Sequence, residues 1–215
     1  EDLDVEERNL LSVGYKNLVG AGRGSHRQVK HQMDSKSSEL AKGFLEVIAV
    51  ETTGVCKEIL GVLEETLIPN AKKLNEKAAT EDKDATMQAC IFYLKMAGDY
   101  YRYLAEIDKN SGHEKKAQNF YTEGSELAKT ALPATDPIRL GLALNLSVCY
   151  YEILDNRKEA CKLAKDAFDQ AISKLDQLEE VQYKDATLIM QLLRDNLTLW
   201  TNSENDDVTL ENADE

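Results

Sequence analysis

The chain has 215 residues, of which 42% are hydrophobic and 30% are charged, so it is long enough to bury a sizeable core. Its 39 acidic residues outnumber its 26 basic ones, and the formal charge of −13 argues against general binding to nucleic acid or to an anionic membrane. Only three prolines are present, and Leu, Ala, Glu and Lys are abundant, which favours an all-α fold.

Apolar residues recur at helical spacing along most of the chain, and we expect about seven helices. These helices are expected at about 1–33, 39–65, 86–108, 115–131, 138–154, 157–177 and 183–201. Pro69 should end the second helix, and the lysine- and acid-rich stretch 71–86 should be a loop or a frayed helix start. No strand alternation appears. The pattern predicts an array of antiparallel helices that forms a concave groove like that of tetratricopeptide proteins, although no clean 34-residue period is present.

We expect one all-helical domain over 1–202 and a flexible acidic tail over 203–215, since the last fifteen residues hold six acids and no base. The four cysteines form no CxxC pair and are predicted to be reduced core thiols of a cytoplasmic protein. The three histidines lack metal-ligand spacing, and no apolar run of about 18 residues is present. We therefore expect no metal, no cofactor and no membrane span.

No catalytic motif is present. The sequence contains no GxSxG, HExxH, P-loop or GxGxxG pattern, and the glycine-rich stretch 20–24 follows a helix where a dinucleotide site would need a strand. The sequence also lacks the paired acid and base that a hydrolase using groove carboxylates would need. We expect that the protein is not an enzyme.

Two groups of basic residues are candidates for binding a phosphate. Lys16, Arg23 and Arg27 lie seven and four residues apart, so they return to nearly the same side of a helix. Arg102 is followed by Tyr103, which also donates hydrogen bonds, and Lys95 lies on the same side as Arg102. A planar guanidinium fork matches phosphate oxygens well. The alternative is a set of solvated helix faces in which Asp99 and other carboxylates pair with these cations.

Two apolar stripes each carry an asparagine. Leu144, Val148 and Glu152 follow one another at intervals of four, with Asn145 beside them. The last helix repeats the design with Leu188, Leu192 and Asn196, and with Ile189 and Trp200 nearby. Such stripes usually face a core. An asparagine amide, however, both donates to and accepts from a peptide backbone, so it can hold an extended peptide without reading its sequence.

Four segments that include these residues strongly resemble the 14-3-3 family, in that family's order. They are EERNLLSVGYKNLVGAGR, FYLKMAGDYYRYLAE, DPIRLGLALNLSVCYYEIL and YKDATLIMQLLRDNLTLW. The resemblance implies a nine-helix, all-α fold. It also implies a dimeric cytosolic adaptor that binds phosphoserine and phosphothreonine motifs of partner proteins.

The resemblance implies a role for each matching position. The implied phosphate ligands are Lys16, Arg23, Arg102 and Tyr103. The implied peptide ligands are Asn145 and Asn196 for the backbone, Leu144, Val148, Leu188, Ile189 and Leu192 as an apolar wall, and Lys95, Glu152, Asp195 and Trp200 along the same groove.

The sequence departs from the family pattern at several positions. Gly22 replaces the first of two adjacent arginines, so a supporting cation is expected to be missing, and His26 replaces a tryptophan. The sequence begins where the family's third helix begins. The two helices that build most of the family's dimer contact are absent from this sequence, and a homodimer is expected from the family alone.

The leading hypothesis is a non-catalytic adaptor that binds phosphorylated partners and regulates signalling. The alternative is a tetratricopeptide-like scaffold that binds unmodified peptides. We also expect that the acidic tail can occupy the phosphate pocket of its own chain, because tethering gives it a high effective concentration there.

Overall fold

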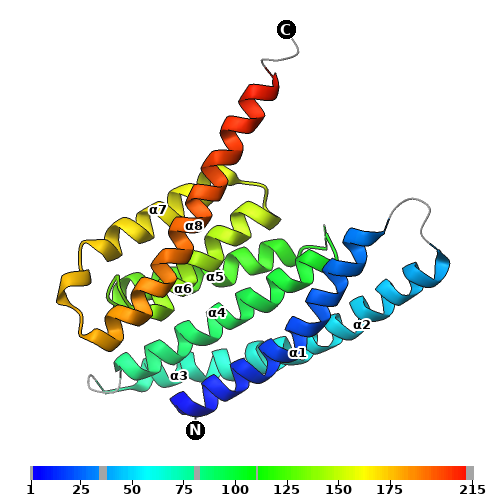
Figure 1. The fold of residues 1–215 in the computed structure, drawn as a ribbon. Coiled ribbons are helices and arrows are strands. Elements are labelled where there is room, and N and C mark those ends of the chain that lie inside the picture. Colours follow the sequence, from blue (N-terminus) through cyan, green and yellow to red (C-terminus); the bar gives the residue numbers. More distant parts are fainter. Residues whose placement is uncertain (1, 34–37, 80–82, 110, 212–215) are drawn as a thin grey trace. The chain divides into compact units, whose positions relative to one another are not determined.

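The computed structural model describes residues 2–33, 38–79, 83–109 and 111–211, with side chains described as far as residue 202. Over these residues the protein is all-α, which confirms the predicted fold class (Figure 1). The helices are α1 (Val5–Gln32), α2 (Glu39–Val62), α3 (Ile68–Lys77), α4 (Lys83–Ile107), α5 (His113–Ala131), α6 (Pro137–Val148), α7 (Arg157–Ile172) and α8 (Glu180–Glu211). Two π-helical segments, η1 (Leu63–Leu67) and η2 (Cys149–Ile153), and the 3-10 turn η3 (Leu175–Gln177) lie among them.

Side-chain caps set several helix starts. At α1 the Asp4 carboxylate accepts from the Glu7 amide at 2.9 Å, and the Glu7 carboxylate accepts from the Asp4 amide at 2.9 Å. Asp136 caps α6 by accepting from the amides of Ile138 and Arg139. These bonds satisfy backbone donors that have no partner inside the helix, so the local sequence determines where the helices begin.

The prediction that Pro69 ends a helix was wrong, and the stretch 71–86, predicted to be a loop or a frayed helix start, belongs to α3 as far as Lys77 and to α4 from Lys83. The chain stays helical from α2 through η1 into α3, and α4 starts at Lys83; residues 80–82 lie outside the described ranges. In η1 the Ile68 amide donates to the Leu63 carbonyl, five residues back. Pro69 occupies the first turn of α3. The wider π turn shifts the hydrogen-bond register just where an α-helix would place a carbonyl against the proline ring.

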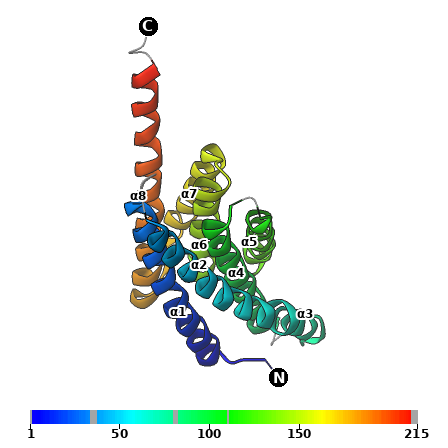
Figure 2. The same cartoon turned by 90° about the vertical axis from the view of Figure 1, so that its right-hand side faces the viewer.

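Two compact units make up the chain, Glu1–Ala117 (unit 1) and Gln118–Glu215 (unit 2), and the boundary falls within α5. In unit 1, α1 packs against α2, and both α2 and α3 pack against α4 (Figure 2). In unit 2, α6 packs against α7 and α8, and α7 packs against α8. The sequence predicted a single domain over 1–202, and that prediction is not tested by the structure.

The last helix is longer than predicted. We expected it to end near Thr201, but α8 continues to Glu211 because no glycine or proline stop signal follows Trp200. Residues 212–215 lie outside the described ranges, and the predicted flexibility of 203–215 stays a prediction. In the part of the chain that the structure describes, no helix combines the length and apolar character needed to cross a membrane.

Candidate functional site

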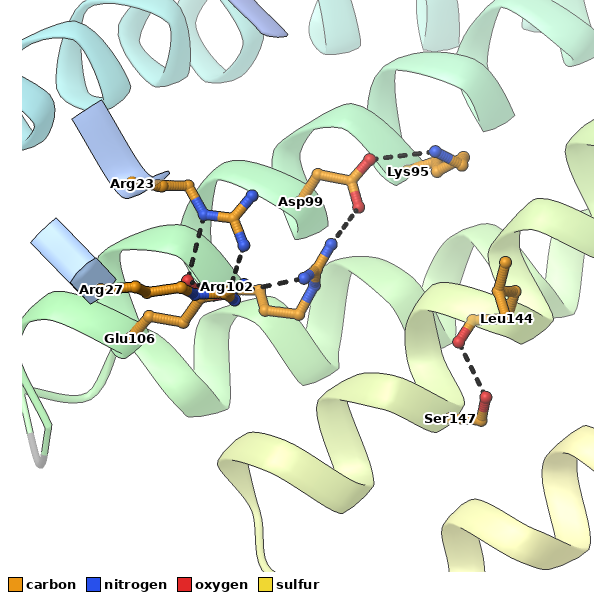
Figure 3. Close-up of polar contacts among 8 residues, drawn as sticks. All are labelled: Arg23, Arg27, Lys95, Asp99, Arg102, Glu106, Leu144 and Ser147. Atoms are coloured by element: carbon orange, nitrogen blue, oxygen red, sulfur yellow. Dashed lines mark hydrogen bonds and ion pairs between the residues drawn. The ribbon is translucent and has the colours of Figure 1, made fainter. Parts of the chain in front are cut away.

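Three guanidinium groups of unit 1 converge on the carboxylate of Glu106 (Figure 3). Arg23 approaches it with two donors, Nε to Oε2 at 3.0 Å and Nη2 to Oε1 at 2.6 Å. Arg27 Nη2 lies 3.0 Å from Oε2, and Arg102 Nη1 lies 3.7 Å from Oε1. The Glu106 side chain is only 13% exposed, and its pairs with the largely buried Arg23 and Arg102 are weakly screened by water, whereas Arg27 is 58% exposed. The carboxylate therefore fixes the positions of three cations from two helices.

A second carboxylate extends the cluster along α4. Asp99 accepts from Arg102 Nη2 at 3.2 Å and from Lys95 Nζ at 2.9 Å. The pairing of Asp99 with these cations, which the sequence offered as the alternative to phosphate binding, is present in the structure. Four cations now face two carboxylates, which leaves an excess of two positive charges on a chain whose formal charge is −13. We call the residues Arg23, Arg27, Lys95, Asp99, Arg102 and Glu106 the cationic cluster.

Tyr103 forms an aromatic wall of this cluster. The Arg23 guanidinium carbon lies 3.7 Å from the centroid of its ring, and that of Arg102 lies 4.8 Å away. The Tyr103 ring also meets Tyr100 edge to face at 5.6 Å. Burial, with the nearby Asp99 carboxylate, raises the pKa of the Tyr103 phenol, so the phenol stays protonated and can donate at neutral pH.

Lys16 is exposed on α1, two turns before Arg23 and on the same side of the helix. Within the described ranges no hydrogen bond or ion pair engages its ammonium group, and none engages the Tyr103 hydroxyl. Of the predicted basic stripe, Arg23 and Arg27 share a carboxylate, whereas Lys16 does not join them. Arg23 and Arg27 are therefore paired with a carboxylate, as the alternative interpretation expected. The ammonium group of Lys16 keeps its hydrogen-bond donors available.

Gly22 of α1 lies directly against Thr52 of α2. A Cβ atom at this position would lie 2.2 Å from Thr52 Oγ1. Thr52 is buried and donates to the Ile48 carbonyl at 2.7 Å, so its hydroxyl is held in place. The sequence suggested that Gly22 removes a supporting cation. In the structure it also leaves room for the Thr52 side chain, and a larger side chain at this position would have to displace that side chain.

Two further buried groups line the same helix contact. The His26 side chain is buried, and burial and the Lys30 charge lower its pKa, while Glu106 opposes them. Cys56 is fully buried, and burial raises the pKa of its thiol to about 12, against the opposing effect of Arg23. The cysteines are free thiols, as predicted, and three of the four are buried.

Apart from Lys95, which pairs with Asp99 in unit 1, the predicted peptide-binding residues belong to unit 2, and the structure divides them into exposed and buried groups. Leu188 and Leu192 on α8 are 67% and 46% exposed, and Glu152 is exposed on η2. The half-buried residues are Leu144, Asn145, Val148, Ile189 and Asn196. Of these, the apolar ones pack on the edge of the core between α6, α7 and α8. The Ser147 hydroxyl turns back to the Leu144 carbonyl at 2.7 Å (Figure 3).

Trp200 is 3% exposed, which makes it part of the core of unit 2. Its ring stacks on Tyr151 with centroids 4.7 Å apart, and its carbonyl accepts from Arg157 Nε at 2.8 Å. In this conformation the ring stabilises the contact between η2 and α8. The resemblance implied that Trp200 lies along a peptide groove, and the structure gives its side chain a packing role.

Glu106 is the residue that sequence reasoning missed. It follows Arg102 by four positions, a helical spacing that signals an ion pair and could have indicated it. Its contacts with Arg23 and Arg27 join positions about 80 residues apart, which no local pattern reveals.

Together, the all-α fold and a tight group of arginines with an excess of positive charge define a helical protein with a site suited to a compact anion. The family model described as 14-3-3 protein matches residues 1–201. A 14-3-3 protein beta/alpha of Xenopus tropicalis is 48% identical over 99% of this chain and 85% of its own length. A 14-3-3-like protein B of Hordeum vulgare is 49% identical over 100% of this chain and 80% of its own length. A 14-3-3-like protein 2 of Caenorhabditis elegans is 49% identical over 100% of this chain and 84% of its own length.

The chain belongs to the 14-3-3 family. The match spans both compact units and all of the residues predicted to form the site.

Proposed function

We propose that this protein is a non-catalytic adaptor that binds phosphoserine or phosphothreonine segments of partner proteins and so takes part in signalling. The observation that carries the proposal is the excess of two positive charges in the cationic cluster, flanked by the exposed Lys16 ammonium and the Tyr103 hydroxyl. A phosphate ester carries about −1.5 to −2 charges at neutral pH, so it would nearly neutralise this excess.

In this proposal Lys16, Arg23, Arg102 and Tyr103 bind the phosphate, and the residues of unit 2 bind the peptide chain. Asn145 and Asn196 would pair with the peptide backbone, while the exposed Leu188 and Leu192 would cover apolar side chains of the ligand. A peptide bound through its backbone can vary in sequence, which suits an adaptor with many partners. The cytoplasm as its compartment and a homodimer as its assembly belong to the same proposal and rest on the family.

The test is a calorimetric titration of the full chain with one phosphoserine peptide and its unphosphorylated twin. We expect measurable affinity for the phosphopeptide and a loss of at least about a hundredfold without the phosphate, since each charge-assisted hydrogen bond contributes about 1.5–3 kcal/mol. Equal affinities would refute phosphate recognition and favour the alternative function, a tetratricopeptide-like scaffold for unmodified peptides.

Lys16→Gln is the sharpest variant for this test. Arg23 and Arg102 also hold carboxylates, so truncating either one mixes lost ligand contacts with lost stability. Lys16 is exposed and engages no carboxylate in the described part of the chain, so its loss should leave the melting temperature unchanged. We expect phosphopeptide affinity to fall about tenfold, with little change for the unphosphorylated twin.

Lys57→Gln is the matched control, because it makes the same charge change at another exposed lysine of unit 1. If it weakens the phosphopeptide as much as Lys16→Gln does, the effect comes from total charge, and the assignment of Lys16 to the phosphate site is wrong.

A further inference from the structure

A cavity of about 260 Å³ lies within unit 2, between α5, α6 and α7. None of its lining residues belongs to the proposed phosphate- or peptide-binding set. An engineered apolar cavity of about 150 Å³ in another protein binds benzene, so this one has room for a larger ring.

Small side chains make the space. Ala143 on α6 and Ala167 on α7 stand where leucines would fill the gap, and Leu146 and Leu163 complete an apolar interior. Tyr150 forms another part of the wall, and Gln118 Nε2 donates to its phenol oxygen at 2.8 Å, which fixes the ring. An apolar interior with a fixed aromatic wall suits a flat hydrophobic ring.

The charged residues that line the cavity differ in whether they have a partner in the protein. Arg139 donates to the Leu132 carbonyl at 2.8 Å and to Gln170 Oε1 at 2.8 Å, so its fork is committed to the protein. The lining also includes Glu126, Glu159 and Asp166. Within the described residues neither Glu126 nor Asp166 has an ion pair or a hydrogen bond to its carboxylate. Lys129 is the one further cation among the lining residues, so carboxylates outnumber the available cations.

A buried hydroxyl adds a polar contact. Ser125 lines the cavity, and its Oγ is buried without a hydrogen-bond partner among the described residues. Buried polar groups in folded proteins are nearly always paired, so an unpaired one beside a cavity is a candidate contact for a ligand.

We propose that this cavity is a second ligand site, which takes a small aromatic amine: the ring enters the interior lined by Ala143, Leu146, Leu163 and Ala167, and the ammonium group lies near Glu126 and Asp166. This ligand class satisfies the apolar volume and the unpaired carboxylates together.

The site is independent of the proposed peptide site. Along α6, at about 100° per residue, Ala143 and Leu146 face the cavity, whereas Asn145 and Val148 point to the opposite side. A ligand in the cavity therefore occupies a different surface from a bound peptide, and failure of one proposal leaves the other standing.

Tryptamine is the probe, with indole-3-acetate as the same ring system carrying the opposite charge. We expect saturable chemical-shift changes of the isotope-labelled full chain on adding tryptamine, centred on the cavity residues, and at least about fivefold weaker binding of indole-3-acetate. The result that overturns the proposal is the absence of saturable tryptamine binding up to about 10 mM, or equal binding of the two probes.

Two variants separate shape from charge. Ala167→Leu fills the interior and should abolish tryptamine binding, while Asp166→Asn removes one carboxylate from the rim and should weaken it about threefold. Melting temperature and phosphopeptide affinity should stay at wild-type values in Asp166→Asn, which shows that the chain is folded. Unchanged tryptamine binding in both variants would place the probe elsewhere and refute the assignment.

Discussion

At the scale of single residues, Glu106 decides the state of the cationic cluster. Three guanidinium groups of like charge repel one another, and a single carboxylate at 2.6–3.7 Å offsets that repulsion. It also orders the side chains, because Arg23 meets it through two parallel donors. Glu106 therefore acts through the arginines, as a positioning residue.

Glu106→Gln should expose this role. The amide keeps the size of the side chain but loses the charge, so the free protein should lose about 2–3 kcal/mol of unfolding free energy from the uncompensated arginines. A bound phosphate supplies the missing negative charge. We therefore expect a saturating phosphopeptide to raise the melting temperature of the variant by more than it raises that of the wild type.

Glu46→Gln, at an exposed position of α2, serves as the control and should behave like the wild type. If Glu106→Gln melts at the wild-type temperature without peptide, Glu106 does not hold the arginines together.

His26 gives unit 1 a dependence on pH. Burial and Lys30 lower the folded-state pKa of its imidazole below the usual value of 6.5, although Glu106 acts in the opposite direction. Between the lowered pKa and 6.5, the unfolded chain binds more protons than the folded one. The free energy of unfolding should therefore be complete above about pH 6.5 and should fall as the pH drops through this window.

Chemical denaturation between pH 5 and pH 7.5 would measure this slope, in steps of about half a unit. His26→Gln should make the free energy of unfolding nearly independent of pH between pH 6.5 and the lowered pKa. The steeper loss of stability at lower pH, which comes from carboxylates, should remain. His31→Gln, at an exposed position of the same helix, is the control. An equal slope in wild type and His26→Gln would contradict the assignment.

At the scale of elements, the contact between α1 and α2 depends on a glycine. Gly22→Ala places a Cβ against the Thr52 hydroxyl, and rotating that side chain away would break its bond to Ile48. Overpacking costs about 1–3 kcal/mol, which outweighs the gain of up to about 1 kcal/mol from the better helix former. We expect a net loss of stability, measured by denaturant unfolding.

Gly20→Ala tests the same change where no atom lies within 4 Å, so it should be stabilising. Adding Thr52→Ala to Gly22→Ala should recover part of the loss, because only the residue-52 Cβ, at 3.3 Å, then remains close. A stabilising Gly22→Ala would mean that α2 yields at this contact.

Sequence periodicity predicted the helices well where one face is buried and a cap or turn residue follows. α4 and α5 lie within about three residues of their predicted bounds, because their apolar spacing is strong. The error at Pro69 has a physical cause: a π-helical segment depends on the packing of neighbouring helices, and the sequence carries no local signal for it. In α2, Thr52 is a poor helix former, yet its burial against α1 holds the helix through it.

At the scale of the whole molecule, the candidate site could be predicted only in part. Helical spacing and family resemblance both indicated Arg23 and Arg102, which the structure brings together at Glu106, while the role of Lys16 stays a prediction. Glu106 and the contact of Gly22 with Thr52 were not predicted, because both depend on which helices meet. A cluster with two excess positive charges on a chain of −13 is a local feature that the overall charge conceals.

From the same charge contrast we predict that the acidic C-terminal segment competes with phosphopeptides for the site. The last fifteen residues carry six acids and no base, and covalent attachment gives them an effective concentration in the millimolar range. Ending the chain after Asn202 retains the bond between Arg157 and the Trp200 carbonyl. We expect this truncation to tighten phosphopeptide binding about two- to tenfold at low salt, and the gain to shrink near 0.5 M salt, where surface charges are screened.

A full-length variant with all six acids changed to their amides separates charge from chain length. If the acidic charges compete with phosphate, this variant should bind as tightly as the truncated one. If it binds like the wild type while truncation still helps, the segment acts by bulk. If neither change affects affinity, the segment does not reach the site.

Because neutralising the segment also removes general repulsion of an anionic peptide, the comparison needs a second peptide of the same net charge without phosphate. Only competition at the cationic cluster improves binding of the phosphopeptide more than binding of that control.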